Sequence, residues 1–134
     1  MTADRSKDNL DSIARTVRGD LVKLSNSART PHLGSSLSCV DILVVLYWNV
    51  LNLTPEKPDV IDRDRFILSK GHAATTLYAV LNRRGYISDD VLKSYAVPGG
   101  VLPEHPIYKS APGIEATSGS LGHGLSLGLG MALS

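Results

Sequence analysis

Apolar and polar positions alternate with the period of a helix in the first part of the chain. Apolar side chains recur at steps of three and four residues, at Leu10, Ile13, Val17, Leu21 and Leu24. Charged residues such as Arg15 and Lys23 occupy the other side, so the pattern predicts an amphipathic helix over residues 8–27. Pro31 and Gly34 then interrupt this helix.

A more apolar run predicts a second, more deeply buried helix. The run covers residues 42–48, and we expect the helix to continue to about Leu51. Ser38, with Asp41 three residues later, resembles a capping box and predicts where this helix begins.

Residues Arg65–Ser69 form a short apolar run after a charged turn, which suits a strand buried on both faces. Helical spacing resumes after it, at Ala73, Leu77, Val80 and Leu81. Gly85 is expected to end this third helix and Ser88 to cap a short fourth one. A buried strand must pair on both edges. Either other strands escape the pattern or another polypeptide completes the sheet, and we favour the second explanation because the chain also ends within a predicted helix.

The sequence changes character after Tyr95. Charged residues become rare, prolines and glycines become frequent, and the stretch predicts a long loop. Long loops in compact domains are usually functional or disordered, and the apolar content with two histidines favours a site loop. The apolar segment Leu121–Ser134 predicts a last helix. Its Gly124 and Gly128 share one face and allow another backbone to approach closely.

Composition narrows the class of protein. The chain has 134 residues, 43% of them hydrophobic, a single cysteine and a formal net charge of +1. These values describe one soluble globular domain without disulfides and without the basic patch that nucleic acid requires. The longest apolar run is far shorter than the roughly 20 residues of a membrane-spanning helix, and the amino terminus does not resemble a signal peptide. We therefore expect a cytoplasmic protein that binds neither nucleic acid nor membrane.

His32, His72 and His105 each lie beside glycine or proline, in separate parts of the chain. Histidines gathered from separate loops suit proton transfer and hydrogen bonding to hydroxyl or phosphate oxygens. Taken singly, each can equally satisfy a loop carbonyl. His72 follows Lys70 at the predicted strand end and helix start, where anions and ligands of α/β sheets bind. A phosphate-bearing ligand is therefore predicted, although Lys70 can equally be a solvated charge. The chain has no triphosphate-loop, dinucleotide or zinc-binding pattern.

Four separated blocks of sequence resemble the amino-terminal part of transketolases. They are His32-x-Gly34-x-x-Leu37, Asp62–Ala74, His105-Pro106 and Pro112–Ser126. The blocks occur in the family's order and cover nearly the whole chain. The closest likeness is to the amino-terminal subunit of split transketolases, whose two halves are separate polypeptides.

The resemblance implies an α/β architecture, namely an incomplete thiamine diphosphate-binding fold that is helix-rich, with a parallel sheet completed by another chain. Residues 1–134 would form the amino-terminal part of its diphosphate-binding domain, truncated or split before the Gly-Asp-Gly metal motif. The implied enzyme uses thiamine diphosphate and magnesium to transfer a two-carbon ketol unit between sugars. Other transketolase subunits would supply the magnesium ligands, the pyrimidine domain and an activating glutamate, so the chain alone would be inactive.

The resemblance also implies roles for individual residues. His32 would contact the sugar or sugar-phosphate substrate and His105 the donor hydroxyls, which makes these two the catalytic candidates. His72 would lie near the cofactor diphosphate, and Ser35 would approach the cofactor. The stretch that packs against the cofactor rings would be Gly119, Ser120 and Leu121. No metal ligand is expected in this chain.

The chain departs from the family pattern around two of these histidines. Pro31 replaces the usual glycine before His32, and Glu104 and Ile107 flank the His105-Pro106 pair. A carboxylate at Glu104 would repel a phosphorylated substrate, so an unphosphorylated donor or acceptor is one expectation. Two alternative functions remain open. One is a non-catalytic scaffold subunit, and the other is an activity like that of 1-deoxyxylulose-5-phosphate synthase.

Overall fold

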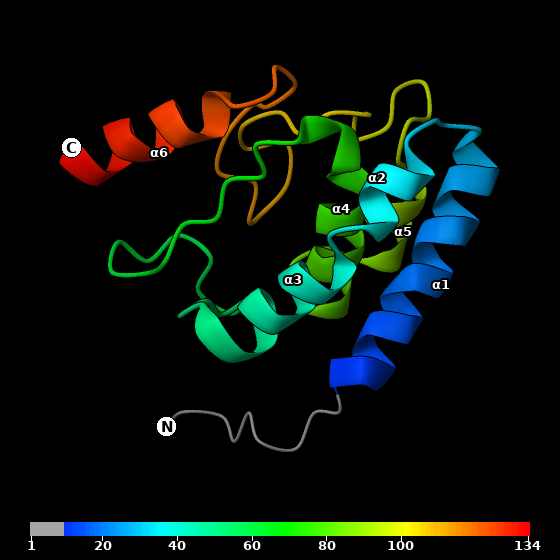
Figure 1. Ribbon diagram of the computed structural model, residues 1–134, viewed down its shortest axis with the longest axis horizontal. Helices are drawn as coiled ribbons and strands as arrows, with labels where there is room; N and C mark the ends of the chain where they lie inside the picture. The colour runs from blue at the N-terminus through cyan, green and yellow to red at the C-terminus, as the bar shows by residue number, and fades with distance from the viewer. Residues whose placement is uncertain (1–9) are drawn as a thin grey trace.

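The computed structural model describes residues 10–134, and their regular secondary structure is helical (Figure 1). The elements in chain order are α1 (Leu10–Ala28), α2 (Leu33–Leu37), α3 (Val40–Val45), a π-helical turn η2 (Leu46–Val50), a 3-10 turn η3 (Gly71–Ala73), α4 (Ala74–Arg83), α5 (Asp89–Lys93) and α6 (His123–Leu133). None of the helices in this part of the chain is long and apolar enough to cross a membrane.

Helices α1, α3 and α4 pack together and enclose the hydrophobic core (Figure 1). The predicted spacing of α1 is confirmed, since Val17 and Leu21 are fully buried; residues 8 and 9 of the predicted range lie outside the described residues. Helix α4 is buried along most of its length. Burying one such aliphatic side chain stabilises the fold by roughly 1.5–3 kcal/mol, so apolar burial holds this bundle together.

The ends of α4 and α5 follow the predicted chemistry. Gly85 has a φ of 84°, and the Tyr86 N–H donates to the Leu81 carbonyl at 2.9 Å. This left-handed glycine ends α4 as expected. The Ser88 hydroxyl caps α5 by accepting from the Val91 N–H at 3.3 Å. Both predictions are therefore confirmed.

The predicted capping box at Ser38 is wrong. The N-cap of α3 is Cys39, and it makes no side-chain capping bond. Ser38 lies instead at the C-terminal end of α2, and its hydroxyl reaches back to donate to the Ser35 carbonyl at 2.7 Å. The intervening helix α2 was not predicted, because glycine and serine are poor helix formers and tertiary contacts hold it.

The strand predicted at Arg65–Ser69, and the parallel sheet, are not formed within residues 10–134. Residues 66–68 make no backbone hydrogen bond to any other described residue. A strand exists only when a neighbouring strand pairs with it, and the described chain offers no second strand. The sheet therefore stays a prediction that depends on residues other than these.

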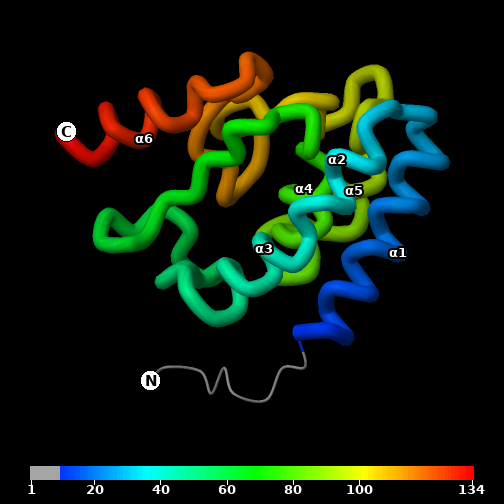
Figure 2. The backbone as a smooth tube through the Cα atoms, viewed as in Figure 1, coloured from blue at the N-terminus to red at the C-terminus, as the bar shows by residue number. Residues whose placement is uncertain are grey.

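Two long non-helical segments, residues 51–70 and 96–122, lie between the bundle and α6 (Figure 2). Arg63 of the first segment forms a two-pronged ion pair with Glu115 of the second, with N–O distances of 2.5 and 3.1 Å. The two side chains are only 12% and 11% exposed. The Tyr78 hydroxyl adds a second anchor by donating to the Pro103 carbonyl at 2.9 Å.

Helix α6 meets the rest of the chain through its glycines, as predicted. A Cβ on Gly124 would lie 2.6 Å from the Ser69 Cβ, and the Gly124 N–H donates to the Ser69 hydroxyl at 3.1 Å. A Cβ on Gly128 would lie 3.8 Å from the Ile67 side chain. The small residues thus let α6 approach the 67–69 backbone closely.

Candidate active site

Two imidazoles from separate segments meet at the amino-terminal ends of α2 and α4. His32 is the N-cap of α2, and His72 lies in η3, directly before α4. Their ring centroids are 5.4 Å apart, in an edge-on arrangement. His32 has a φ of 74°, a left-handed conformation that costs a non-glycine residue roughly 1–2 kcal/mol. Strain of this kind tends to occur at functional sites.

Buried hydrogen bonds fasten α2 to α4 and so bring the two rings together. The Thr75 hydroxyl donates to the Ser36 hydroxyl at 2.7 Å, and the Thr76 hydroxyl donates to the Ser36 carbonyl at 2.7 Å. Both hydrogen bonds are buried, and a buried polar group without a partner destabilises the fold. The chain therefore fixes His32 and His72 from the interior of the fold.

His105 of the second long segment belongs to the same cluster. Partial burial lowers the pKa of His72, and the nearby charges of Lys70, His32 and His105 lower this pKa further. A histidine with a lowered pKa is neutral at physiological pH, so it can donate from one nitrogen and accept at the other. The structure thus places His32 and His105, from distant parts of the chain, within electrostatic reach of His72.

Glycines let the second long segment approach the histidines. A Cβ on Gly71 would lie 2.8 Å from the Gly119 nitrogen and from the Ser118 carbonyl group. A Cβ on Gly119 would lie 3.8 Å from the His105 ring. The bare backbone at Gly119 is therefore one wall of the imidazole cluster.

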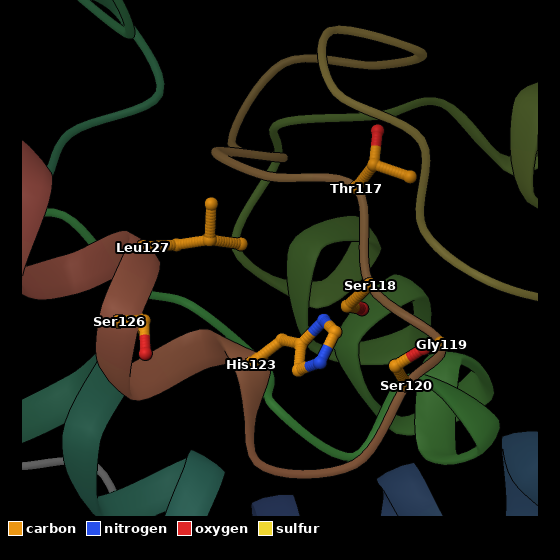
Figure 3. A pocket seen from close by; sticks show the side chains of 7 residues that line it. All are labelled: Thr117, Ser118, Gly119, Ser120, His123, Ser126 and Leu127. Carbon is orange, nitrogen blue, oxygen red and sulfur yellow. The ribbon is translucent and has the colours of Figure 1, made fainter.

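A cavity of about 630 Å³ opens beside this wall. Its lining residues are Thr117, Ser118, Gly119, Ser120, His123, Ser126 and Leu127. Figure 3 shows the His123 ring projecting from the start of α6 toward Ser118 and Ser120. The Ser118 hydroxyl is buried and has no hydrogen-bond partner among residues 10–134. Buried hydroxyls normally have a partner, so Ser118 is an exception, while the other hydroxyl groups and the imidazole of the lining can hydrogen-bond to polar atoms of a ligand.

The remaining predicted site residues are less closely gathered. Gly119 and Ser120 line the cavity, whereas Leu121 is 68% exposed and is not among the described lining residues. The Ser35 carbonyl accepts from the Lys70 ammonium at 3.0 Å. The structure thus places His32 against His72 and Gly119 beside His105, with His105 close enough to act on His72 through its charge, and the roles of all these residues stay predictions.

Sequence reasoning gave no role to His123 or Ser118. His123 lies between Gly122 and Gly124, the same glycine context that distinguished the other histidines, so this signal was available. The burial of the Ser118 hydroxyl depends on the path of the loop, and no sequence pattern carries that information. Within residues 10–134, no group of three or more His, Cys, Asp or Glu side chains is arranged to hold a metal ion.

The imidazole cluster and the adjoining cavity, which is lined by hydroxyl groups, suit a polar organic ligand. The family model described as "Transketolase, thiamine diphosphate binding domain" matches residues 7–134. The chain therefore belongs to the transketolase family, in its thiamine diphosphate binding domain.

Individual relatives agree with this assignment. The chain is 42% identical over 117 residues to one subunit of an apulose-4-phosphate transketolase from Phocaeicola vulgatus, an alignment that covers 87% of this chain and 41% of the relative. It is 42% identical over 103 residues to a 6-deoxy-6-sulfo-D-fructose transketolase subunit from a Clostridium species, covering 77% of this chain and 38% of that protein. The solved transketolase from Leishmania mexicana superposes with a TM-score of 0.89 at 31% identity, over 94% of this chain and 19% of that one.

Proposed function

We propose that this chain is a component of a thiamine diphosphate-dependent transketolase that transfers a two-carbon ketol unit between sugars. The observation that carries the proposal is the gathering of His32 and His105 around His72, with the Gly119 backbone beside the His105 ring. The chain spans only about two fifths of the curated relatives, 41% of one and 38% of another. The activity of the whole enzyme is therefore part of the proposal.

The residues present fit thiamine diphosphate. The cavity whose lining includes Ser120, His123 and Ser126 offers space for a ligand, and these hydroxyl and imidazole groups can hydrogen-bond to polar atoms. When bound, the cofactor supplies the carbanion chemistry of ketol transfer. His72 would lie near the diphosphate and can donate a hydrogen bond to it, Ser35 would approach the cofactor, and the stretch Gly119, Ser120 and Leu121 would pack against its rings.

His32 and His105 are the proposed substrate-binding histidines. Each imidazole can donate to or accept from a sugar hydroxyl, and can hold or move a proton there. The substrate is a sugar or a sugar phosphate. The exposed carboxylate of Glu104, next to His105, would repel a phosphate at that end of the substrate.

Other transketolase subunits are proposed to complete the site with the pyrimidine domain. A diphosphate normally binds with a divalent cation that takes oxygen ligands, and we propose that these partners carry the magnesium ligands. The chain alone is then inactive. We propose the cytoplasm as the compartment, because the single cysteine, Cys39, is buried and unpaired, as is usual in reducing compartments.

The test is reconstitution of the full chain with candidate partner subunits, thiamine diphosphate and magnesium, followed by an assay of ketol transfer. His105→Ala is expected to lower kcat/KM by about 100-fold or more. Lys109→Ala, an exposed change on the same segment, serves as the matched control and is expected to leave activity unchanged. Full activity of the His105→Ala complex would contradict catalysis and support a scaffold role. Product formation with pyruvate as donor would instead support a synthase of the 1-deoxyxylulose-5-phosphate type.

A further inference from the structure

We propose that Lys70 is a positioning residue, which ties the α2 turn to the segment that carries His72 and holds the His32–His72 pair in place. Neither the family match nor the named relatives assign it a role. The role of the His32–His72 pair in the site rests on the proposed function. The contacts that Lys70 makes lie within this chain and do not depend on that function. It deepens the description of the site by naming what keeps two of its imidazoles in contact.

The geometry of the tether is direct. The Lys70 ammonium donates to the Ser35 carbonyl at 3.0 Å and lies 3.1 Å from the Ser38 hydroxyl. That hydroxyl in turn donates to the Ser35 carbonyl at 2.7 Å. Two of the three donors of one ammonium group are thus directed at the end of α2, across a sequence separation of more than thirty residues.

Helix α2 needs such support. It has five residues, and isolated helices of that length are unstable in water. It also begins at His32, whose left-handed backbone is strained. Thr75 and Thr76 hold the buried side of the helix through Ser36. Lys70 holds its other side, so both attachments act on the segment that carries His32.

The same ammonium group also acts on His72 through its charge. The charged and titratable groups that act on His72 are Lys70, His32 and His105, and all of them carry or acquire positive charge. Among these, lysine alone is charged throughout the physiological range. Removing this charge should therefore raise the pKa of His72, while removing the tether should separate the two rings.

The experiment is an NMR pH titration of the histidine ring protons in the full chain without cofactor, together with the nuclear Overhauser cross-peak between His32 and His72. Lys70→Met is expected to raise the His72 midpoint by about 0.3 pH units or more and to remove the cross-peak. Lys70→Arg keeps the charge without the same fit; its midpoint should stay near the wild-type value while the cross-peak weakens. Lys93→Met, an exposed lysine paired with Asp90 on α5, is the matched control and should change neither.

An unchanged midpoint and cross-peak in a folded Lys70→Met variant would overturn the proposal. If that variant does not fold, as judged by circular dichroism, an unchanged cross-peak in Lys70→Arg would overturn it. Because no thiamine diphosphate is present, this failure is distinct from failure of the proposed function. That second failure would appear as absent cofactor binding in the wild-type complex.

Discussion

The helical bundle and the site region of this chain are held together in different ways. The bundle of α1, α3 and α4 buries apolar side chains such as Leu21 and Leu81 completely. The site region, residues 51–70 and 96–122 with α6, depends on single polar contacts and close backbone approaches. Arg63–Glu115 and Gly71–Gly119 are the main examples.

The difference between the two regions separates stability from chemistry. Apolar burial tolerates volume-conserving changes, so the bundle can serve as a scaffold. A polar contact, or a close backbone contact at a glycine, is lost when either residue is replaced. Such contacts determine where His105 and Gly119 lie. The substitutions below therefore test whether a few contacts position the site while many stabilise the bundle.

The largest effect is expected from breaking the Arg63–Glu115 ion pair. Arg63→Met leaves the Glu115 carboxylate buried without its partner, and such losses cost about 3–5 kcal/mol. Urea denaturation of the full chain measures this change in the free energy of unfolding. Arg18→Met, which removes an ion pair whose side chains are 39% and 69% exposed, is the control and should cost about 1 kcal/mol or less. Equal, small costs for both variants would show that the pair does not anchor the site region.

Truncating a buried side chain in the bundle is expected to lower the free energy of unfolding by somewhat less. It should have no local effect on the site region. Leu21→Ala removes a fully buried side chain and should destabilise the chain by about 2–5 kcal/mol. Val22→Ala, at a neighbouring position that is 51% exposed, should change stability by less than about 1 kcal/mol. Similar losses at the two positions would contradict the assigned orientation of α1.

A methyl group at Gly71 should disturb the site more than its size suggests. Its Cβ would meet the backbone of Ser118 and Gly119 at 2.8 Å, and overpacking of this kind costs about 1–3 kcal/mol. Gly34→Ala is the matched control, because nothing lies within 4 Å of its Cβ position. It should stabilise the chain by about 0.5–1 kcal/mol. Thermal unfolding of both variants measures these changes in stability. An unchanged stability of Gly71→Ala would contradict the close approach of Gly71 to the backbone of Ser118 and Gly119.

The smallest expected effect is a dependence of stability on pH. The pKa of His72 is lowered in the folded chain by partial burial first and then by neighbouring positive charge. As pH falls below the unfolded value of about 6.5, the unfolded state takes up the proton first, so stability declines toward lower pH. His72→Gln should flatten the part of the profile below about pH 6.5. An identical slope in the variant would contradict the assignment.

Much of the bundle could be predicted from the sequence, because its helices bury apolar residues at regular spacing. The period around Val17 and Leu21, and the signals at Gly85 and Ser88, identified α1, α4 and α5. Helix α2 and the N-cap at Cys39 escaped prediction, since tertiary hydrogen bonds rather than local propensity determine them.

The site was predicted only in part, because contacts between distant parts of the chain determine the rest of it. Glycine and proline context, with the family resemblance, selected His32, His72 and His105, and the structure brings these together. The cavity lining at Ser118 and His123 depends on how residues 96–122 turn back toward α4. That path depends on contacts such as Arg63–Glu115, which join positions far apart in the sequence and leave no local pattern.

The most direct test of the central claim is a calorimetric titration of the assembled enzyme with thiamine diphosphate in the presence of magnesium. With wild-type chain the cofactor should bind, and His72→Ala should weaken its affinity by about ten-fold or more, equivalent to about 1.4 kcal/mol. The matched Lys93→Met chain should bind as tightly as wild type. Equal affinities for the wild-type and His72→Ala enzymes would show that the imidazole cluster is not part of the cofactor site.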